Sequence, residues 1–385
     1  MRELGAHSRL ERLAGVWPRI FEAARAESGP APFHVVWRVS PQLDLVVMSS
    51  ILSGIATLEK RNRISLSFEM LDRATDEPEA VMELVVTNTE TGVTRNVVID
   101  CYDRADRFSP TALESSDVYF KRAFAPETLS AACPSCSPKI VPAGLSFGCY
   151  SREALRHVCI AVLASLGREP LRSRQAIRDL LHRAYAAARL WLTFPTPQGP
   201  VLRDTDVKHL NIVFQPRLWP TTPGSGDQFD VVNRDRIAMV RALKKAFPHE
   251  RAIGLVHSDM SIAVAPDLLL PEHVRTGKFH AQLRQAHIAV NCVGLSGSIG
   301  FKFGEYLAAG TAIVSQPITH QFLAPIVEGV HYLAYRSPDE CIDLCRRLMS
   351  DRDLTARMHE VNHQYFLDWV DPAANMAHLL TRAFA

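Results

Sequence analysis

A lysine and a glutamate follow a glycine-rich turn within the segment from Gly294 to Gly310, where a buried strand predicted over 287–293 gives way to a helix. Open α/β sheets bind their ligands at the carboxyl ends of such strands. Glycines let the backbone approach an anion closely, and the free N–H groups at a helix start suit a diphosphate. The segment therefore predicts an anion-binding turn.

Two side chains in the predicted helix fit this chemistry. Lys302 puts a positive charge in the first turn, which disfavours the helix itself but suits a bound phosphate. Glu305 follows about one turn later, where it can accept hydrogen bonds from ribose or sugar hydroxyls. The alternative interpretation is that the glycines form a tight turn without a ligand and that Lys302 is solvated. The predicted donor-binding residues of this segment are Ser298, Ile299, Gly300, Lys302 and Glu305.

The run from Lys302 to Val314, Lys-Phe-Gly-Glu-Tyr-Leu-Ala-Ala-Gly-Thr-Ala-Ile-Val, resembles the donor-site helix and next strand of group 1 GT-B glycosyltransferases (family 4-like). The resemblance extends from Asn211 to the C-terminus. It implies two facing Rossmann-like domains, with a nucleotide sugar in the C-terminal one, the acceptor mainly in the N-terminal one, and a terminal helix crossing back to the N-terminal domain. It also implies an enzyme that moves the sugar to an acceptor hydroxyl or other nucleophile.

The chain departs from this family at two positions, which indicates a divergent branch. Gly297 stands where many members have a first glutamate that contacts the donor sugar, and Ala312 replaces the commoner proline. The family also holds the diphosphate with a basic residue after the first strand of the C-terminal domain. The matching residue here is Arg217, whose guanidinium suits bidentate phosphate contacts. Arg234 and Arg236 are second choices, with a solvated helix start as the alternative.

Residues for the acceptor side are less sharply defined. Asp100 and Asp103 follow a predicted strand, and a carboxylate at a strand end can take a proton from an acceptor hydroxyl. His257 follows another predicted strand and is a third catalytic candidate. Lys121 and Arg122 are candidates for acceptor binding. For the aspartates, a capping or ion-pair role is the competing interpretation.

Length and composition limit the number of domains, the partners and the location of the protein. A chain of 385 residues exceeds one hydrophobic core, and its net charge of +2, without a basic stripe, argues against nucleic acid as a partner. We expect no membrane span, since the longest apolar run, 158–166, is far shorter than a bilayer requires. Scattered cysteines and the absence of a signal-peptide pattern predict a cytoplasmic protein.

Alternating predicted strands and helices indicate two parallel-sheet domains. A cluster of breakers from Pro195 to Pro200 marks the boundary between them. We expect an acceptor-binding domain over 1–200, a nucleotide-sugar-binding domain over 201–370, and a terminal helix over 371–385 packed on the first domain. Pro134, Pro138 and Pro142 predict a loop from 133 to 144.

No resident cofactor or metal is expected, because basic side chains and the helix start can neutralise the diphosphate. Cys133 and Cys136 have metal-type spacing but lack a second ligand pair. Two alternatives to a glycosyltransferase stay open: a nucleotide-sugar epimerase on the same fold, and a catalytically silent binding or scaffold subunit. The sequence leaves the donor, the acceptor and the oligomeric state open.

Overall fold

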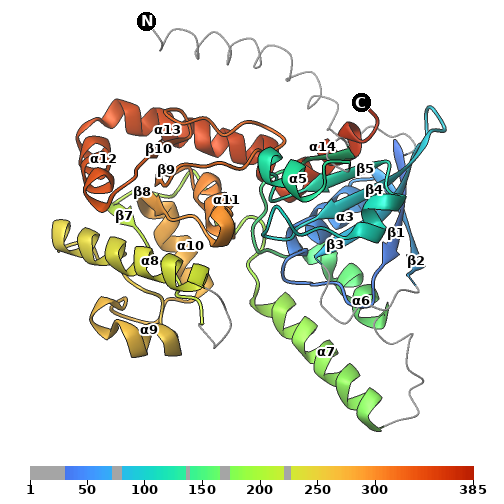
Figure 1. The fold of residues 1–385 in the computed structure, drawn as a ribbon, viewed down its shortest axis with the longest axis horizontal. Helices are drawn as coiled ribbons and strands as arrows, with labels where there is room; N and C mark the ends of the chain where they lie inside the picture. The colour runs from blue at the N-terminus through green and yellow to red at the C-terminus, as the bar shows by residue number, and fades with distance from the viewer. Residues whose placement is uncertain (1–30, 72–79, 136–138, 165–173, 221–226) are drawn as a thin grey trace, which may run out of the picture.

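The computed structural model describes residues 31–71, 80–135, 139–164, 174–220 and 227–385, and its two α/β domains lie side by side (Figure 1). The first thirty residues of the acceptor-binding domain expected over 1–200 lie outside these residues. Each domain is built on its own sheet. None of the helices in the described part of the chain combines the length and hydropathy that a bilayer crossing requires.

The N-terminal domain holds a six-stranded sheet in the order β2-β1-β3-β4-β5-β6. The strands are β1 (Phe33–Val39), β2 (Ile64–Met70), β3 (Val81–Asn88), β4 (Thr94–Asp100), β5 (Val118–Lys121) and β6 (Ile140–Pro142). β1 and β2 are parallel and joined through a helix, which is the βαβ arrangement of a parallel-sheet domain.

One strand differs from the all-parallel sheet expected from the sequence. β3 runs antiparallel to both of its neighbours, β1 and β4. The chain passes from β3 to β4 through the turn at 89–93, where Gly92 has a φ of +71°. A connection this short allows only an antiparallel pair, since parallel strands need a crossover of a dozen or more residues. The segment 133–144, expected as a loop, also contains the short strand β6.

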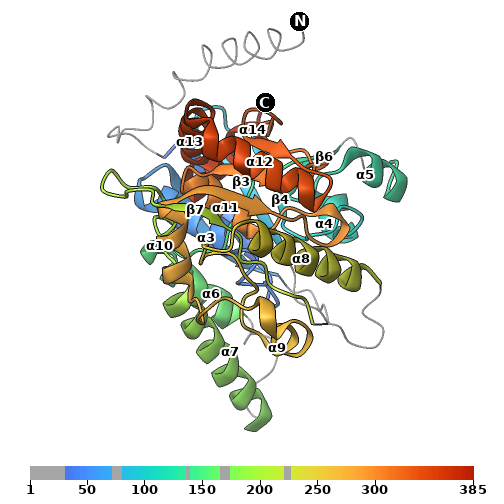
Figure 2. The same cartoon turned by 90° about the vertical axis from the view of Figure 1, so that its left-hand side faces the viewer.

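Helices cover this sheet and one of them comes from the far end of the chain. The helices are α3 (Ser49–Lys60), α4 (Pro110–Ser115), α5 (Pro126–Ala132), η2 (Arg152–Ala154), α6 (Leu155–Ala164), α7 (Arg174–Thr193) and α14 (Pro372–Arg382). α7 extends away from the body in both views (Figures 1 and 2).

The terminal helix α14 crosses back to the N-terminal domain, as expected. Its Met376 and Leu379 join the core that Ile51 and Trp37 form with the first sheet. The contact with α3 is very close, because a Cβ on Gly54 would lie 2.3 Å from the carbonyl oxygen of Pro372. Asp371 caps α14 by accepting from the N–H of Ala373 at 3.0 Å.

The C-terminal domain has a fully parallel sheet in the order β10-β9-β8-β7. The strands are β7 (Leu210–Val213), β8 (Ala286–Asn291), β9 (Ala312–Ser315) and β10 (Tyr332–Ala334). The helices are α8 (Asp227–Ala246), α9 (Asp259–Val264), η3 (Pro266–Leu268), α10 (Thr276–Gln285), η4 (Leu295–Gly297), α11 (Phe301–Ala308), α12 (Pro338–Ser350), α13 (Arg352–Tyr365) and η5 (Phe366–Val370).

The two domains touch through backbone as well as side chains. The N–H of Gln321 donates to the carbonyl of Phe124 at 2.9 Å, and that of Leu323 donates to Ala143 at 3.1 Å. These bonds fix the chain after β9 against the chain that follows β5 and β6. The carboxyl ends of β8 and β9 therefore lie at the junction of the domains.

Candidate functional site

The turn between β8 and α11 has the conformation that its glycines permit. Gly297 has a φ of +73°, a region that costs little only for glycine. The N–H of Gly294 donates to the carbonyl of Ser298 at 2.7 Å and closes the turn. Gly300 is the N-cap of α11 and offers no side-chain hydrogen bond to it. The first N–H groups of this helix therefore receive no cap from their own N-terminal residue.

Lys302 lies half-buried in the first turn of α11, with its ammonium directed toward the chain that follows β7. Its Nζ donates to the carbonyl of Gln215 and lies 4.8 Å from the ring centroid of Phe279. Burial lowers the pKa of Lys302 to about 8, against the opposing effect of Glu305 and with further lowering by Arg217 and Arg236. A cation in this position favours an added negative charge.

Arg217 and Arg236 complete a basic cluster with Lys302. Arg217 is exposed after β7, and its carbonyl accepts from Nη1 of Arg236 at 2.6 Å. Burial lowers the pKa of Arg236, whose Nε has no hydrogen-bond partner among the described residues. In the described part of the chain, none of these three cations forms an ion pair with a carboxylate. The structure thus brings the first-choice residue Arg217 together with Arg236, which sequence reasoning ranked second.

Glu305 is buried one turn after Lys302 and is held by a histidine. Nε2 of His280, in α10, donates to Glu305 Oε1 at 3.1 Å. Sequence reasoning missed His280, because nothing in the local pattern of α10 marks it. Its position depends on the packing of α10 against α11.

Arg122 links the N-terminal domain to the donor turn. Its Nη1 donates to the carboxylate of Asp103, and its Nη2 donates to the carbonyl of Ile299 at 2.8 Å. The guanidinium also stacks on Phe301, with its carbon 5.0 Å from the ring centroid. Arg122 is 6% exposed, whereas the side chain of Asp103 is 57% exposed. The structure therefore brings these two candidates of the acceptor side to the candidate donor turn.

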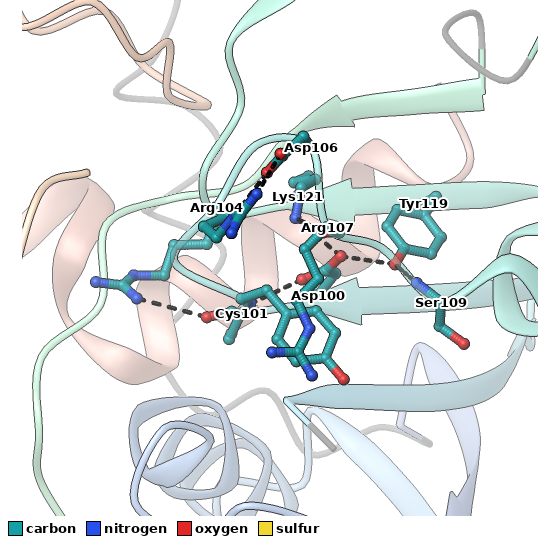
Figure 3. A network of polar contacts seen from close by, with 10 residues as sticks. Asp100, Cys101, Arg104, Asp106, Arg107, Ser109, Tyr119 and Lys121 are labelled. Atoms are coloured by element: carbon teal, nitrogen blue, oxygen red, sulfur yellow. Dashed lines mark hydrogen bonds and ion pairs between the residues drawn. The ribbon is translucent and has the colours of Figure 1, made fainter. Parts of the chain in front are cut away.

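Asp100 and Lys121 are instead paired with each other inside the N-terminal domain (Figure 3). Lys121 Nζ lies 3.0 Å from Asp100 Oδ2, and both side chains are 0% exposed. Tyr119 donates to the same carboxylate at 2.6 Å, and Lys121 also donates to the carbonyl of Arg107 at 2.7 Å. Burial raises the pKa of Asp100, against the lowering by Lys121 and the hydrogen bonds. Neither side chain is accessible to an acceptor in this conformation.

His257 lies apart from this constellation. Its Nε2 donates to the carbonyl of Leu270 at 2.9 Å, and its ring lies 5.9 Å from that of His273. The expected strand before it forms only two isolated bridges, between Ile253 and Phe214 and between Leu255 and Leu269. Within the described residues, His257 makes no hydrogen bond or ion pair with the turn at 294–300.

A small pocket lies between the turn and the N-terminal domain, with space for one water-sized group, about 10 Å³. Its lining residues are Asp103, Arg122, Ala123, Ser298, Ile299, His320 and Phe322. Sequence reasoning missed His320, which no motif marks and which the connection after β9 brings to the turn.

The described residues contain no group of three or more histidine, cysteine, aspartate or glutamate side chains arranged to hold a metal ion. Cys133 is disulfide-bonded, so its sulfur is not a thiolate ligand here. Its sequence neighbour Cys136 lies outside the described residues.

Residues 236–381, which are less than half of the chain, match a family described as glycosyl transferase-like. No curated protein matches the chain.

Similar solved structures include the C-terminal domain of a group 1 glycosyl transferase, LpcC, from Francisella tularensis. It has 13% identity and a TM-score of 0.31, with 44% of this chain and 94% of that chain covered. Anabaena HepE in complex with UDP and glucose has 10% identity, coverages of 86% and 88%, and a TM-score of 0.40. An α1,3-fucosyltransferase also has 10% identity, with coverages of 93% and 92% and a TM-score of 0.40. These structural likenesses are distant, with TM-scores of 0.31 to 0.40.

Proposed function

We propose that this chain, a glycosyltransferase of GT-B architecture, holds a nucleotide sugar at the turn between β8 and α11 and passes the sugar to an acceptor at the domain junction. The observation that carries the donor site is the basic cluster of Arg217, Arg236 and Lys302. These cations converge at the carboxyl ends of β7 and β8 without a carboxylate partner among the described residues. Beside them α11 presents its N-terminus, and both features favour a bound diphosphate.

The same cluster supports the chemistry of transfer. Negative charge builds up on the leaving diphosphate as the bond to the sugar breaks, and positioned cations stabilise that charge. Arginine fits this task because its guanidinium makes bidentate contacts with phosphate and stays charged when partly buried. We propose that these side chains do so without a metal ion or a resident cofactor.

Glu305 fits recognition of hydroxyls at the ribose or the sugar. Its carboxylate is held at 3.1 Å by His280, which fixes its orientation before the donor binds. A carboxylate that is already held in place loses little rotamer freedom when it accepts a hydrogen bond from a hydroxyl. Ser298, Ile299 and Gly300 supply the backbone of the turn in this proposal.

Asp103 is our choice for the base on the acceptor side. Its side chain is more than half exposed at the domain junction, and Arg122 orients it. Asp100 and Lys121 form an internal ion pair, so we give them no contact with substrate. We propose a cytoplasmic location for the reaction, which suits the six free cysteines of the described residues, with Cys133 as the exception.

A thermal-shift panel of UDP-, GDP-, ADP-, CMP- and TDP-linked sugars tests the donor site. The matching donor raises the melting temperature by mass action. Lys302→Ala and Glu305→Ala are expected to abolish that shift. Lys208→Ala is the matched control, since Lys208 is also half-buried but lies just before β7, at the amino ends of the strands rather than their carboxyl ends. If Lys302→Ala responds like the parent, the donor site is misplaced.

Turnover separates the alternatives to transfer. Release of nucleoside diphosphate from the donor supports a transferase, and conversion of the intact nucleotide sugar to an isomer supports an epimerase. Tight donor binding with neither reaction supports a silent subunit. Asp103→Asn is expected to lower transfer at least 100-fold while the donor still binds.

A further inference from the structure

His320 lies at the domain junction on the connection that follows β9. Hydrogen bonds on both sides hold that connection in place. Gln316 Oε1 accepts from the N–H of Val293 at 2.9 Å, and the N–H of Gln321 donates to Phe124 of the N-terminal domain at 2.9 Å. The imidazole therefore has a defined position beside the donor turn.

Among the described residues, neither ring nitrogen of His320 has a hydrogen-bond partner of normal geometry, although the residue is only 7% exposed. A buried polar group without a partner costs free energy, so such groups call for an explanation. Burial lowers the pKa of His320, the backbone of Gly297 opposes this, and Arg122 and Lys121 lower it further. The ring is accordingly neutral near pH 7, with one donor and one acceptor nitrogen.

Gly297 leaves the space in front of this ring open. A Cβ on Gly297 would lie 3.6 Å from Thr319 Oγ1 and 3.7 Å from His320 Cε1, so it would point at this connection. Because Gly297 has no side chain there, His320 can meet the pocket from the C-terminal domain, where Ser298 is the other polar residue of the lining. Arg122 and Asp103 line the pocket from the other side.

The location of the pocket relative to the basic cluster indicates which part of the donor would reach it. The basic cluster lies toward β7, whereas the pocket lies between the turn and the N-terminal domain. In a transfer reaction the sugar lies between the diphosphate and the acceptor. The pocket has space for one water-sized group, about 10 Å³, which is the size of a hydroxyl. A hydroxyl both donates and accepts, as a neutral imidazole does, whereas a phosphate only accepts.

We propose that this pocket receives one hydroxyl group of the donor sugar and that His320 is the hydrogen-bonding partner of that hydroxyl. The inference rests on the proposed function, because the donor turn must be where the nucleotide sugar binds. It assigns a sugar-recognising role to a residue that neither the family match nor the sequence pattern identifies.

Isothermal titration with matched ligand pairs tests this role. The probes are UDP-glucose with UDP, GDP-mannose with GDP, and ADP-glucose with ADP. For the pair that the parent binds, His320→Ala is expected to weaken binding of the nucleotide sugar about 10-fold, the loss typical of one hydrogen bond. Binding of the free diphosphate is expected to stay within about twofold of the parent, since the base and phosphates bind elsewhere.

Two further variants control for effects on folding. His320→Gln keeps most of the volume and a donor and acceptor, and is expected to recover part of the lost affinity. His331→Ala removes a histidine of similar burial at the amino end of β10, and should change neither affinity. If His320→Ala is too unstable to titrate, the parent itself is titrated with singly deoxygenated sugar analogues. One analogue must then bind about 10-fold more weakly, and His320→Gln must reduce that difference.

The outcomes separate this inference from the donor site. If His320→Ala binds the nucleotide sugar as tightly as the parent, or loses sugar and diphosphate binding equally, the role of His320 is overturned while the donor site stands. If no deoxygenated analogue is discriminated, the result is the same. If the parent binds no nucleotide sugar and no diphosphate, the proposed function fails and this inference fails with it.

Discussion

Lys208 and Lys302 lie at opposite ends of helix α11, and burial lowers the pKa of each to about 8. Lys208 Nζ donates to the carbonyls of Ala309 at 3.1 Å and Ala286 at 2.9 Å, close to the C-terminal ends of α11 and α10. A cation stabilises a helix there. Lys302 lies at the N-terminus, where the helix dipole opposes it. The first lysine stabilises the fold, and the second is in a position where a bound anion would stabilise it further.

Replacing each lysine by methionine is therefore expected to change stability in opposite directions. Lys302→Met removes a poorly placed buried charge and should raise the free energy of unfolding by about 1 kcal/mol. Lys208→Met leaves buried carbonyls without a donor and should lower it by about 1–3 kcal/mol. Denaturant titration of the ligand-free proteins measures both. Equal losses in the two variants would mean that Lys302 is as structural as Lys208.

The pH dependence of the same comparison follows from the pKa of Lys302. The folded-state pKa is about 8 and the ordinary value is 10.5, so between these values the unfolded chain binds more protons. The cost of burying the charged lysine is complete below pH 8 and disappears as pH rises toward 10.5. The stability gain of Lys302→Met over the parent should therefore shrink from pH 7 to pH 10. Donor affinity of the parent should fall over the same range, and a pH-independent gain would contradict this assignment.

Local sequence patterns were sufficient to predict the elements around the donor turn. The glycines and Lys302 predicted a strand, a turn and a helix where β8, η4 and α11 are found, and Ser337 caps α12 by accepting from the N–H of Glu340 at 3.2 Å. The antiparallel direction of β3 was not predicted, because the apolar pattern does not encode the direction of a strand and the short connection over 89–93, which does, was not used.

Roles that depend on burial could not be read from the sequence. Asp100 and Asp103 look alike as carboxylates after a strand, yet one is enclosed with Lys121 and the other faces the junction. His280 and His320 reach the site only through packing between segments far apart in the chain. No local spacing identifies such contacts.

The two aspartates should accordingly respond differently to amide substitution. Asp100→Asn leaves Lys121 charged and unpaired in the interior, which is expected to cost about 3–5 kcal/mol of stability. Asp103→Asn changes a largely exposed carboxylate and should cost less than about 1 kcal/mol. Thermal unfolding and turnover, measured on the same preparations, separate the two. A stable but inactive Asp100→Asn would restore Asp100 as a catalytic residue.

Arg122→Ala tests the link between the domains. The substitution removes the hydrogen bond to Ile299 and the orientation of Asp103, while the basic cluster around Lys302 is left intact. We expect kcat to fall at least 10-fold and the Kd for the nucleoside diphosphate to stay within about twofold. Arg122→Lys should rescue little, because an ammonium cannot make the two separate contacts of a guanidinium. Loss of diphosphate binding in Arg122→Ala would show that the arginine acts on the donor directly.

Arg234 and Arg236 lie two positions apart on α8 and provide a matched pair for the diphosphate site. Arg234 is exposed, whereas Arg236 is half-buried beside Arg217 and contributes to lowering the pKa of Lys302. Arg236→Gln is expected to weaken binding of the nucleoside diphosphate about 10-fold, the loss of one charge-assisted hydrogen bond. Arg234→Gln should leave binding within about twofold, because a solvated charge is screened by salt. Titrations of both variants with the nucleoside diphosphate at two ionic strengths measure these affinities. If both variants lose the same affinity, and the loss disappears at high salt, Arg236 contributes only general electrostatic attraction.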